Sequence, residues 1–494
     1  MPPMLQLPKI IQGGMGVGVS NWKLAQAVSR LGQLGVVSGT ALDQVLVRRL
    51  ADGDEGGHMR RGFDAFPFPE MAKRIWTDYF QEAGKPAGTA YPTTPMHQRR
   101  DTRKLVELLM VSNFVEVFLA REGHLNKVGV NFLEKVQLPH LASIYGAMLA
   151  GVGYVLMGAG IPLHIPGVLD NFAAGKSAEY KLAVTGAPPD ADTLMRFNPQ
   201  DYAEGPLPEL ERPNFLAIVS SNTLASTMLR RASGRVDGLI IESPIAGGHN
   251  APPRGRGALD ATGQPIYGER DRVDLGELRR LGVPFWLAGG YGSAEKLEEA
   301  LGEGAAGVQV GTAFAFSEES GLRHDLKKAL VAQARQGTAK VFTDPVASPT
   351  GFPFKVAQLP GTYSDPGVAA ARTRVCDLGY LREAYWTEDG KTAYRCSAEP
   401  ETSYVAKGGR VEETVGRKCL CNALLSNIGY PQTRPDGVAE PPLVTVGDDV
   451  NRVAAFVTSG RDSYTAADVV NLLLRGDVSS EKNPSIRNQV LASS

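Results

Sequence analysis

Short hydrophobic segments alternate with longer segments of helical periodicity over the first two thirds of the chain. Each short segment ends in or is followed by Gly, Ser or Asn, and this order of strand, loop and helix is typical of a parallel sheet. The pattern predicts eight strands, at residues 9–11, 35–37, 128–131, 153–157, 214–219, 238–242, 285–288 and 307–310. Eight strands can close a barrel, so we expect an α/β fold, a (β/α)8 TIM barrel.

The first strand leads into a glycine-rich loop and then into a helix. Leu24, Ala27, Val28 and Leu31 recur at helical spacing, so one side of this helix can pack on the sheet. Ser20 precedes the helix and is the expected N-cap residue.

Two regions depart from the strand and helix pattern. Residues 42–123 are richer in charged and aromatic residues and predict a helical insertion that covers the barrel mouth. Beyond about residue 337 the pattern fades, which divides the chain into a barrel at 1–340 and a C-terminal extension at 341–494. Residues 466–474 have the pattern of a helix that docks back on the main body.

Residues 136–169 contain no Asp, Glu, Lys or Arg and are long enough to span a bilayer. Several glycines and Pro162 interrupt this segment, which favours a buried helix followed by a buried strand at 154–157. The N-terminus lacks the pattern of a secretory signal, so we expect a cytoplasmic protein.

The composition favours a large globular protein, because 43% of the residues are hydrophobic and 21% are charged. The 52 basic residues nearly balance the 53 acidic ones, so no net field attracts a polyanion. We therefore expect neither a nucleic acid nor a membrane as partner.

Small residues follow the last two predicted strands. Gly290 follows the seventh strand, and Gly311 and Thr312 follow the eighth. In TIM barrels these two loops commonly form a phosphate site, because small residues let backbone N–H groups approach an anion. The alternative is that the glycines only turn the chain, but two such loops in consecutive units favour phosphate binding.

A third glycine loop, Ala246-Gly247-Gly248, follows the sixth strand and leads to His249. The two glycines let the backbone pass close to a flat ring, and an imidazole can exchange protons near neutral pH. The position of His249 after a barrel strand favours a catalytic role over a structural one. Ser220, Ser221 and Asn222 follow the fifth strand and either line the mouth or form an ordinary turn.

The glycines at positions 14, 16 and 18 also follow a strand, which raises the question of a dinucleotide-binding fold. Val19 occupies the place of the third glycine of that fingerprint, so this fold is disfavoured.

All four cysteines, Cys376, Cys396, Cys419 and Cys421, lie within one short part of the extension. Structural disulfides are disfavoured in a cytoplasmic protein, so the cluster suggests a zinc site or an iron–sulfur cluster. The spacing is unusual for metal sites, and buried free thiols are an equal alternative.

These loops resemble those of the nitronate monooxygenase (2-nitropropane dioxygenase-like) flavoproteins, which include FMN-dependent enoyl reductases. The shared motifs occur in the family's order over residues 9–320: Ile11-Gln12-Gly13-Gly14-Met15, Gly129-Val130-Asn131, Ala246-Gly247-Gly248-His249, Ala288-Gly289-Gly290 and Val308-Gln309-Val310-Gly311-Thr312. The insertion and the extension are not part of the minimal family fold.

The resemblance implies FMN across the barrel mouth, with Gln12, Gly13, Gly14, Met15 and Asn131 near the flavin ring. It places the loops after the last two strands on the phosphate, and it makes His249 the proton-transferring residue beside a small-molecule substrate.

The expected function is the oxidation of alkyl nitronates with dioxygen. The alternatives are an enoyl reductase of fatty-acid or polyketide synthesis that uses NAD(P)H, and a non-catalytic scaffold. The sequence leaves a homo-oligomer open.

Overall fold

The computed structural model describes residues 7–475, apart from 256 and 459. Eight parallel strands form one sheet in the order β1-β11-β10-β9-β8-β4-β3-β2. Their bounds are β1 Ile10–Gln12, β2 Gly35–Ser38, β3 Val128–Leu133, β4 Tyr154–Gly158, β8 Asn214–Val219, β9 Gly238–Glu242, β10 Phe285–Ala288 and β11 Gly307–Val310. All eight coincide with the predicted strands to within two residues at each end, which confirms the TIM barrel.

The sheet closes between its first and last members. A parallel bridge joins Ile11 to Leu34, and the N–H of Gln12 donates to the carbonyl of Leu34 at 2.9 Å. Inside the barrel, side chains such as Leu156, Ile240 and Trp286 form a separate buried cluster. The barrel interior is therefore a packed core, and any ligand site must lie at its ends.

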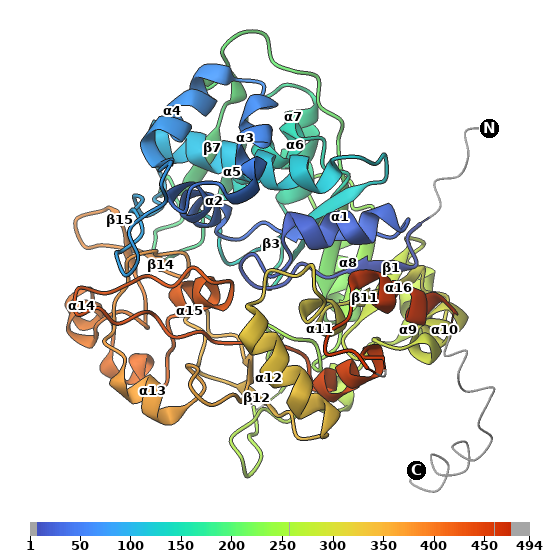
Figure 1. Cartoon of the computed structure of the whole chain (residues 1–494). Helices are drawn as coiled ribbons and strands as arrows, with labels where there is room; N and C mark the ends of the chain where they lie inside the picture. Colours follow the sequence, from blue (N-terminus) through green and yellow to red (C-terminus); the bar gives the residue numbers. More distant parts are fainter. Residues whose placement is uncertain (1–6, 256, 459, 476–494) are drawn as a thin grey trace, which may run out of the picture.

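Helices surround the barrel in the usual alternation (Figure 1). Those that follow the barrel strands are α1 Trp22–Arg30, α6 His140–Leu149, α7 Ile165–Ala173, α8 Asn222–Arg231, α9 Leu275–Arg280, α10 Ala294–Gly302, α11 Thr312–Ala315 and α12 His324–Arg335. The predicted N-cap of α1 was wrong by one residue, because Asn21 accepts from the N–H of Leu24. Ser20 instead binds the loop after β1, where it accepts from the N–H of Met15 and donates to the carbonyl of Gly13.

The predicted insertion contains α2 Leu42–Ala51, α3 His58–Asp64, α4 Pro69–Tyr79 and α5 Arg103–Arg121. Helix α5 is almost wholly buried and packs against α1 and α6, so it takes the place of the barrel helix between β2 and β3. The other three helices pack outside it, in the upper part of Figure 1.

The helix and the strand predicted within the uncharged segment at 136–169 are α6 and β4, and the segment also contains the start of α7, which was not predicted. Both α6 and β4 are buried within the protein. Among the described residues, no helix has the length and apolar character needed to cross a membrane.

Small sheets lie outside the barrel. Strand β5 Ala178–Lys181 pairs with β7 Leu194–Phe197, and β12 Val341–Asp344 pairs with β13 Phe354–Ala357. In the extension, β14 Glu383–Trp386 pairs with β15 Thr392–Arg395 on one side and with β6 Val184–Thr185 on the other.

The extension continues through α13 Pro366–Ala371, α14 Glu401–Ala406 and α15 Leu420–Asn427 to α16 Ala466–Arg475. Helix α16 buries Val469, Val470 and Leu473 and packs against α1 and α10, so the predicted docking of this helix on the barrel is confirmed.

Candidate active site

A cavity of about 840 Å³, part of it open to solvent, lies at the carboxyl ends of the barrel strands. We call it the mouth cavity. Residues of β3, β8, β9, β10 and β11, together with the loops that follow β1, β9, β10 and β11, form its wall. No residue of the 42–123 insertion lines it, which differs from the expectation that the insertion covers the mouth.

Almost every residue predicted to bind the cofactor lines this cavity. They are Gly13, Gly14, Met15, Asn131, Ala246, Gly247, Gly248, Ala288, Gly289, Gly290, Gln309, Gly311 and Thr312. The exception is Gln12, which is fully buried below the cavity. Its side chain donates to Ser20 and to the carbonyl of Gly13 and accepts from the N–H of Val36, so it holds the first loop in place.

The first loop approaches β3 closely. A Cβ atom at Gly14 would lie 2.3 Å from the Cβ of Asn131, which no real pair of carbon atoms tolerates. Glycine at this position therefore lets the first loop pass beside β3 in a space too narrow for a side chain.

The two late turns lie on the same cavity, as the phosphate prediction requires. Gly289 and Gly290 both have positive φ, 86° and 80°, so this turn needs glycine. Gly311 and Thr312 stand at the start of α11 and line the same wall. The Asp449 side chain lies beside both turns, because it is hydrogen-bonded to Thr312 and its Oδ2 would lie 3.5 Å from a Cβ atom at Gly292.

The C-terminal extension contributes part of the wall, which the sequence analysis missed. Thr445, Val446 and Asp449 line the mouth cavity. The N–H of Gly248 donates to Thr445 at 2.9 Å, and the N–H of Gly447 donates to the Thr312 hydroxyl at 3.0 Å. Residues 445–449, which we call the strap, therefore tie the third glycine loop to the last turn.

Asp449 is the acidic residue of the strap. Burial raises its pKa, and its hydrogen bond with Thr312 opposes that rise. A carboxylate at this place would repel a phosphate, so the strap influences how an anion binds here.

Two buried acceptors of the cavity wall lack partners within the described part of the chain. The Oδ1 of Asn131 and the Oε1 of Gln309 receive no hydrogen bond there. Buried polar atoms in folded proteins are nearly always paired, and both of these acceptors belong to residues that line the cavity. The N–H of a flavin ring and the ribityl hydroxyls of FMN are donors of the kind they lack, so these residues fit FMN.

His249 does not line the mouth cavity. Its Nε2 lies 2.7 Å from the Ser348 hydroxyl, and its ring packs edge-on against Phe354. The imidazole is directed toward the extension because its loop pairs with β13, where the N–H of Lys355 donates to the carbonyl of Gly248. Burial lowers the pKa of His249 to about 4, so its ring is neutral at physiological pH.

Glu242 is the titratable residue of the wall that sequence reasoning passed over. It ends β9, and it lines both the mouth cavity and a smaller adjoining cavity formed with Arg254 and Tyr267. Burial raises its pKa to about 8. The sequence signal that could have identified Glu242 is an acidic residue at the end of a strand whose other members are all buried.

The two serines after β8 differ in role: one belongs to an ordinary turn and the other lines a cavity. Ser221 caps α8 by accepting from the N–H of Leu224 at 3.1 Å, which is an ordinary turn role. Ser220 lines the smaller cavity.

The four cysteines gather around one small pocket of the extension. Among the described residues, however, no group of three or more His, Cys, Asp or Glu side chains is placed to hold a metal ion. Burial raises the pKa values of Cys419 and Cys421, which keeps these thiols protonated, whereas metal ligation needs thiolates. The predicted zinc or iron–sulfur site gains no support, and the arrangement matches the alternative of buried free thiols.

Comparison with known proteins finds a similarity to one family over part of the chain. A family model described as nitronate monooxygenase matches residues 195–348. This segment runs from β7 to the loop after β12 and contains the third glycine loop and both late turns. No curated protein matches the chain.

Solved structures resemble the chain over nearly its whole length at low identity. FabK from Thermotoga maritima is 16% identical with a TM-score of 0.49, over 98% of this chain and 97% of that one. Nitroalkane oxidase from Streptomyces ansochromogenes is 16% identical with a TM-score of 0.45, over 95% of each chain. The enoyl reductase domain of MlnA from Bacillus amyloliquefaciens is 11% identical with a TM-score of 0.43, over 98% and 96%.

The chain is a TIM-barrel protein with a cavity at the carboxyl ends of its strands, where enzymes of this fold have their active sites. Over residues 195–348 it is similar to the nitronate monooxygenases.

Proposed function

We propose that this enzyme binds FMN in the mouth cavity and oxidises alkyl nitronates with dioxygen. The observation that carries the proposal is the nitronate monooxygenase match over residues 195–348, which includes Gly248, Gly290 and Thr312 of the cavity wall. When bound, FMN would supply the electron transfer to dioxygen, and the protein's part is binding, orientation and proton transfer.

Each wall segment has a separate part in this proposal. The turns at Gly290 and Gly311 would bind the phosphate through backbone N–H groups, since no cationic side chain lines the mouth cavity within the described residues. Asn131 and Gln309 would accept hydrogen bonds with their unpaired oxygens from the flavin N–H or the ribityl hydroxyls of FMN. Gly14 would let the ring lie directly on the first loop.

An anaerobic titration tests the proposal. Purified protein should be yellow, or should become yellow with added FMN, and a nitronate alone should bleach the flavin absorbance without a nicotinamide nucleotide. Oxygen uptake should follow when air is admitted. A protein that neither carries nor binds FMN would refute the proposal.

A second candidate is an enoyl reductase that uses NAD(P)H. The observation in its favour is Glu242, because a carboxyl group with a pKa of about 8 is protonated at neutral pH and can donate a proton to a reduced enoyl thioester. Rapid anaerobic bleaching by NADH or NADPH, without bleaching by a nitronate, would favour this candidate over the first.

A further inference from the structure

Glu242 is one of three titratable side chains in the wall of the mouth cavity. Strand β9 ends at this residue, and its backbone pairs with Ala288 of β10. The other two are Asp449, which belongs to the strap and binds Thr312, and Tyr291, whose pKa burial raises.

The Glu242 carboxyl group has no hydrogen-bond or ion-pair partner among the residues that the structure describes, and burial is the cause of its raised pKa. The charged groups of the adjoining cavity are satisfied elsewhere. Arg254 donates to the carbonyls of Ser220 and Arg270, and the N–H of Arg254 donates to Asp271. Tyr267 donates to the carbonyl of Ala251. Glu242 is thus free to exchange its proton with a ligand.

His249 cannot serve this role in the arrangement observed. Its Nε2 is taken by Ser348, and the ring packs against Phe354 outside the cavity. Of the two candidate proton-transfer groups, only Glu242 reaches the space in which the flavin and its substrate would lie.

We infer that Glu242, rather than His249, is the residue that removes the proton when this enzyme takes a neutral nitroalkane in place of a preformed nitronate. This inference rests on the proposed function. In the step, the Glu242 carboxylate takes the proton from the carbon next to the nitro group. The C–H bond breaks, its electron pair moves into the nitro group to give the nitronate, and no oxidant is needed.

The step gives the two substrates different requirements. A nitronate is already deprotonated and needs no base, whereas a nitroalkane does. The kcat/KM for a nitroalkane should therefore rise with pH toward a plateau above about pH 8, as Glu242 loses its proton.

The test compares nitroethane with ethylnitronate in the FMN-loaded enzyme. In Glu242→Gln, the ratio of kcat/KM for nitroethane to that for ethylnitronate should fall by about a hundredfold to ten-thousandfold, the usual contribution of a general base. Glu242→Asp keeps a carboxyl group and should regain part of this ratio. Glu298→Gln, on the exposed side of α10, is the matched control and should leave the ratio unchanged.

A second measurement does not depend on turnover. The absorbance spectrum of bound FMN should change with pH around a midpoint near pH 8 in the wild type, because a neighbouring carboxyl group gains a charge there. Glu242→Gln should still bind FMN and should lack this transition.

The two failures can be told apart. A ratio that stays within about threefold in Glu242→Gln, with the spectral transition retained, would overturn the role of Glu242. A fall of the ratio in His249→Gln but not in Glu242→Gln would overturn it as well. A wild-type enzyme that oxidises neither substrate would refute the proposed function, and the spectral transition alone would then decide whether Glu242 titrates beside the flavin.

Discussion

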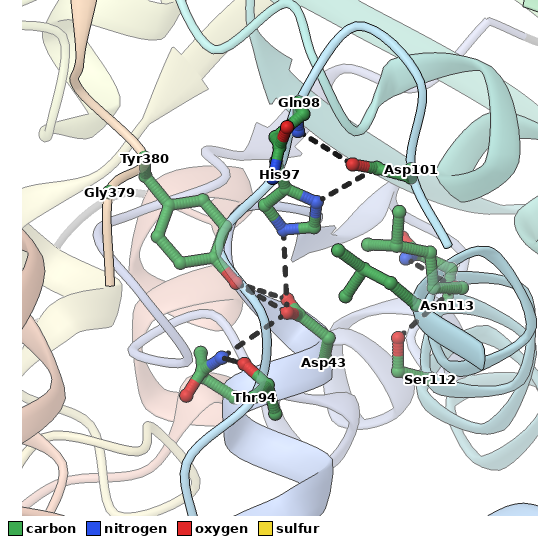
Figure 2. Close-up of polar contacts among 12 residues, drawn as sticks. Asp43, Thr94, His97, Gln98, Asp101, Ser112, Asn113, Gly379 and Tyr380 are labelled. Carbon is green, nitrogen blue, oxygen red and sulfur yellow. Dashed lines mark hydrogen bonds and ion pairs between the residues drawn. The ribbon is translucent and has the colours of Figure 1, made fainter. Parts of the chain in front are cut away.

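The Nε2 of His97 lies 3.5 Å from a carboxylate oxygen of Asp43, and both side chains are almost completely buried. Figure 2 shows the surrounding network. Asp101 approaches the other ring nitrogen of His97 at 3.2 Å, and the Tyr380 hydroxyl donates to Asp43. Asp43 and His97 belong to the insertion and Tyr380 to the extension, so this buried network joins the two parts that depart from the barrel pattern.

The network predicts a pH-dependent stability. The two carboxylates raise the pKa of His97 to about 9 from its ordinary value of 6.5, against the opposing effect of burial. Protonated His97 therefore stabilises the fold fully below about pH 6.5, and this contribution is lost as the pH rises through about 9. Thermal unfolding should show a falling Tm over this range. In His97→Gln the fall should be much smaller, and an equal fall in both proteins would contradict the assignment.

Tyr380 should stabilise the contact between insertion and extension. Tyr380→Phe removes the hydroxyl that donates to the buried Asp43 carboxylate, which should cost about 1–3 kcal/mol of unfolding free energy. Denaturant titration measures the loss. Tyr385→Phe is the matched control, because no hydrogen bond of its hydroxyl joins it to the described part of the chain. Equal effects of the two substitutions would argue against a specific role for the Tyr380 hydroxyl.

Asp449 should weaken FMN binding when it is ionised. Asp449→Asn keeps the hydrogen-bond acceptor for Thr312 but removes the charge beside the proposed phosphate site, and FMN should bind about fivefold tighter or more. Burial raises the pKa of Asp449, so wild-type affinity should fall as the pH rises through that pKa, and the variant should lose this dependence. Quenching of FMN fluorescence measures both. Asp190→Asn, in an exposed loop, should change neither.

Gly14 should be indispensable to the cavity. Gly14→Ala would place a methyl group 2.3 Å from the Cβ of Asn131, so the first loop or β3 must move. We expect at least a tenfold loss of FMN affinity and a destabilisation of about 1–3 kcal/mol. Gly205→Ala has open space around its Cβ and should be neutral in both assays. Undiminished FMN binding by Gly14→Ala would show that the flavin does not rest on this loop.

Much of the barrel was predictable because parallel strands buried on both sides appear as short hydrophobic runs with small residues after them. The same regularity located the cavity wall, since the carboxyl ends of parallel strands meet at one end of a barrel. Gln12 and Ser20 were less predictable, because a side chain at the end of a strand or in the loop after it can point into a cavity or support the loop from outside the cavity, and local spacing does not distinguish these cases.

The orientation of His249 could not be read from its own loop. It depends on β13, more than a hundred residues later in the chain, and on Ser348. The strap is a similar case, because residues 445–449 carry no motif and are tied to the cavity by long-range hydrogen bonds, among them those to Gly248 and Thr312. Glu242 was visible as an acid at the end of a buried strand, but its lack of a partner is a property of the folded protein.

The cysteine pocket gives the last prediction. Burial raises the pKa values of Cys419 and Cys421, while a hydrogen bond with Cys396 lowers the pKa of Cys376. Cys376 is also only partly buried, so it should be the thiol that reacts first with a disulfide reagent in the native protein.

Thiol titration with and without denaturant, together with elemental analysis, tests this view of the pocket. Four thiols should react after unfolding, and the fast native reaction should disappear in Cys376→Ser. Protein purified without chelators should contain well below one zinc or iron per chain, because the described residues offer no set of metal ligands. The opposite result would be about one equivalent of zinc or iron per chain, and a chelator that removes both this metal and the protection of the thiols. That result would show that the cysteines bind a metal ion.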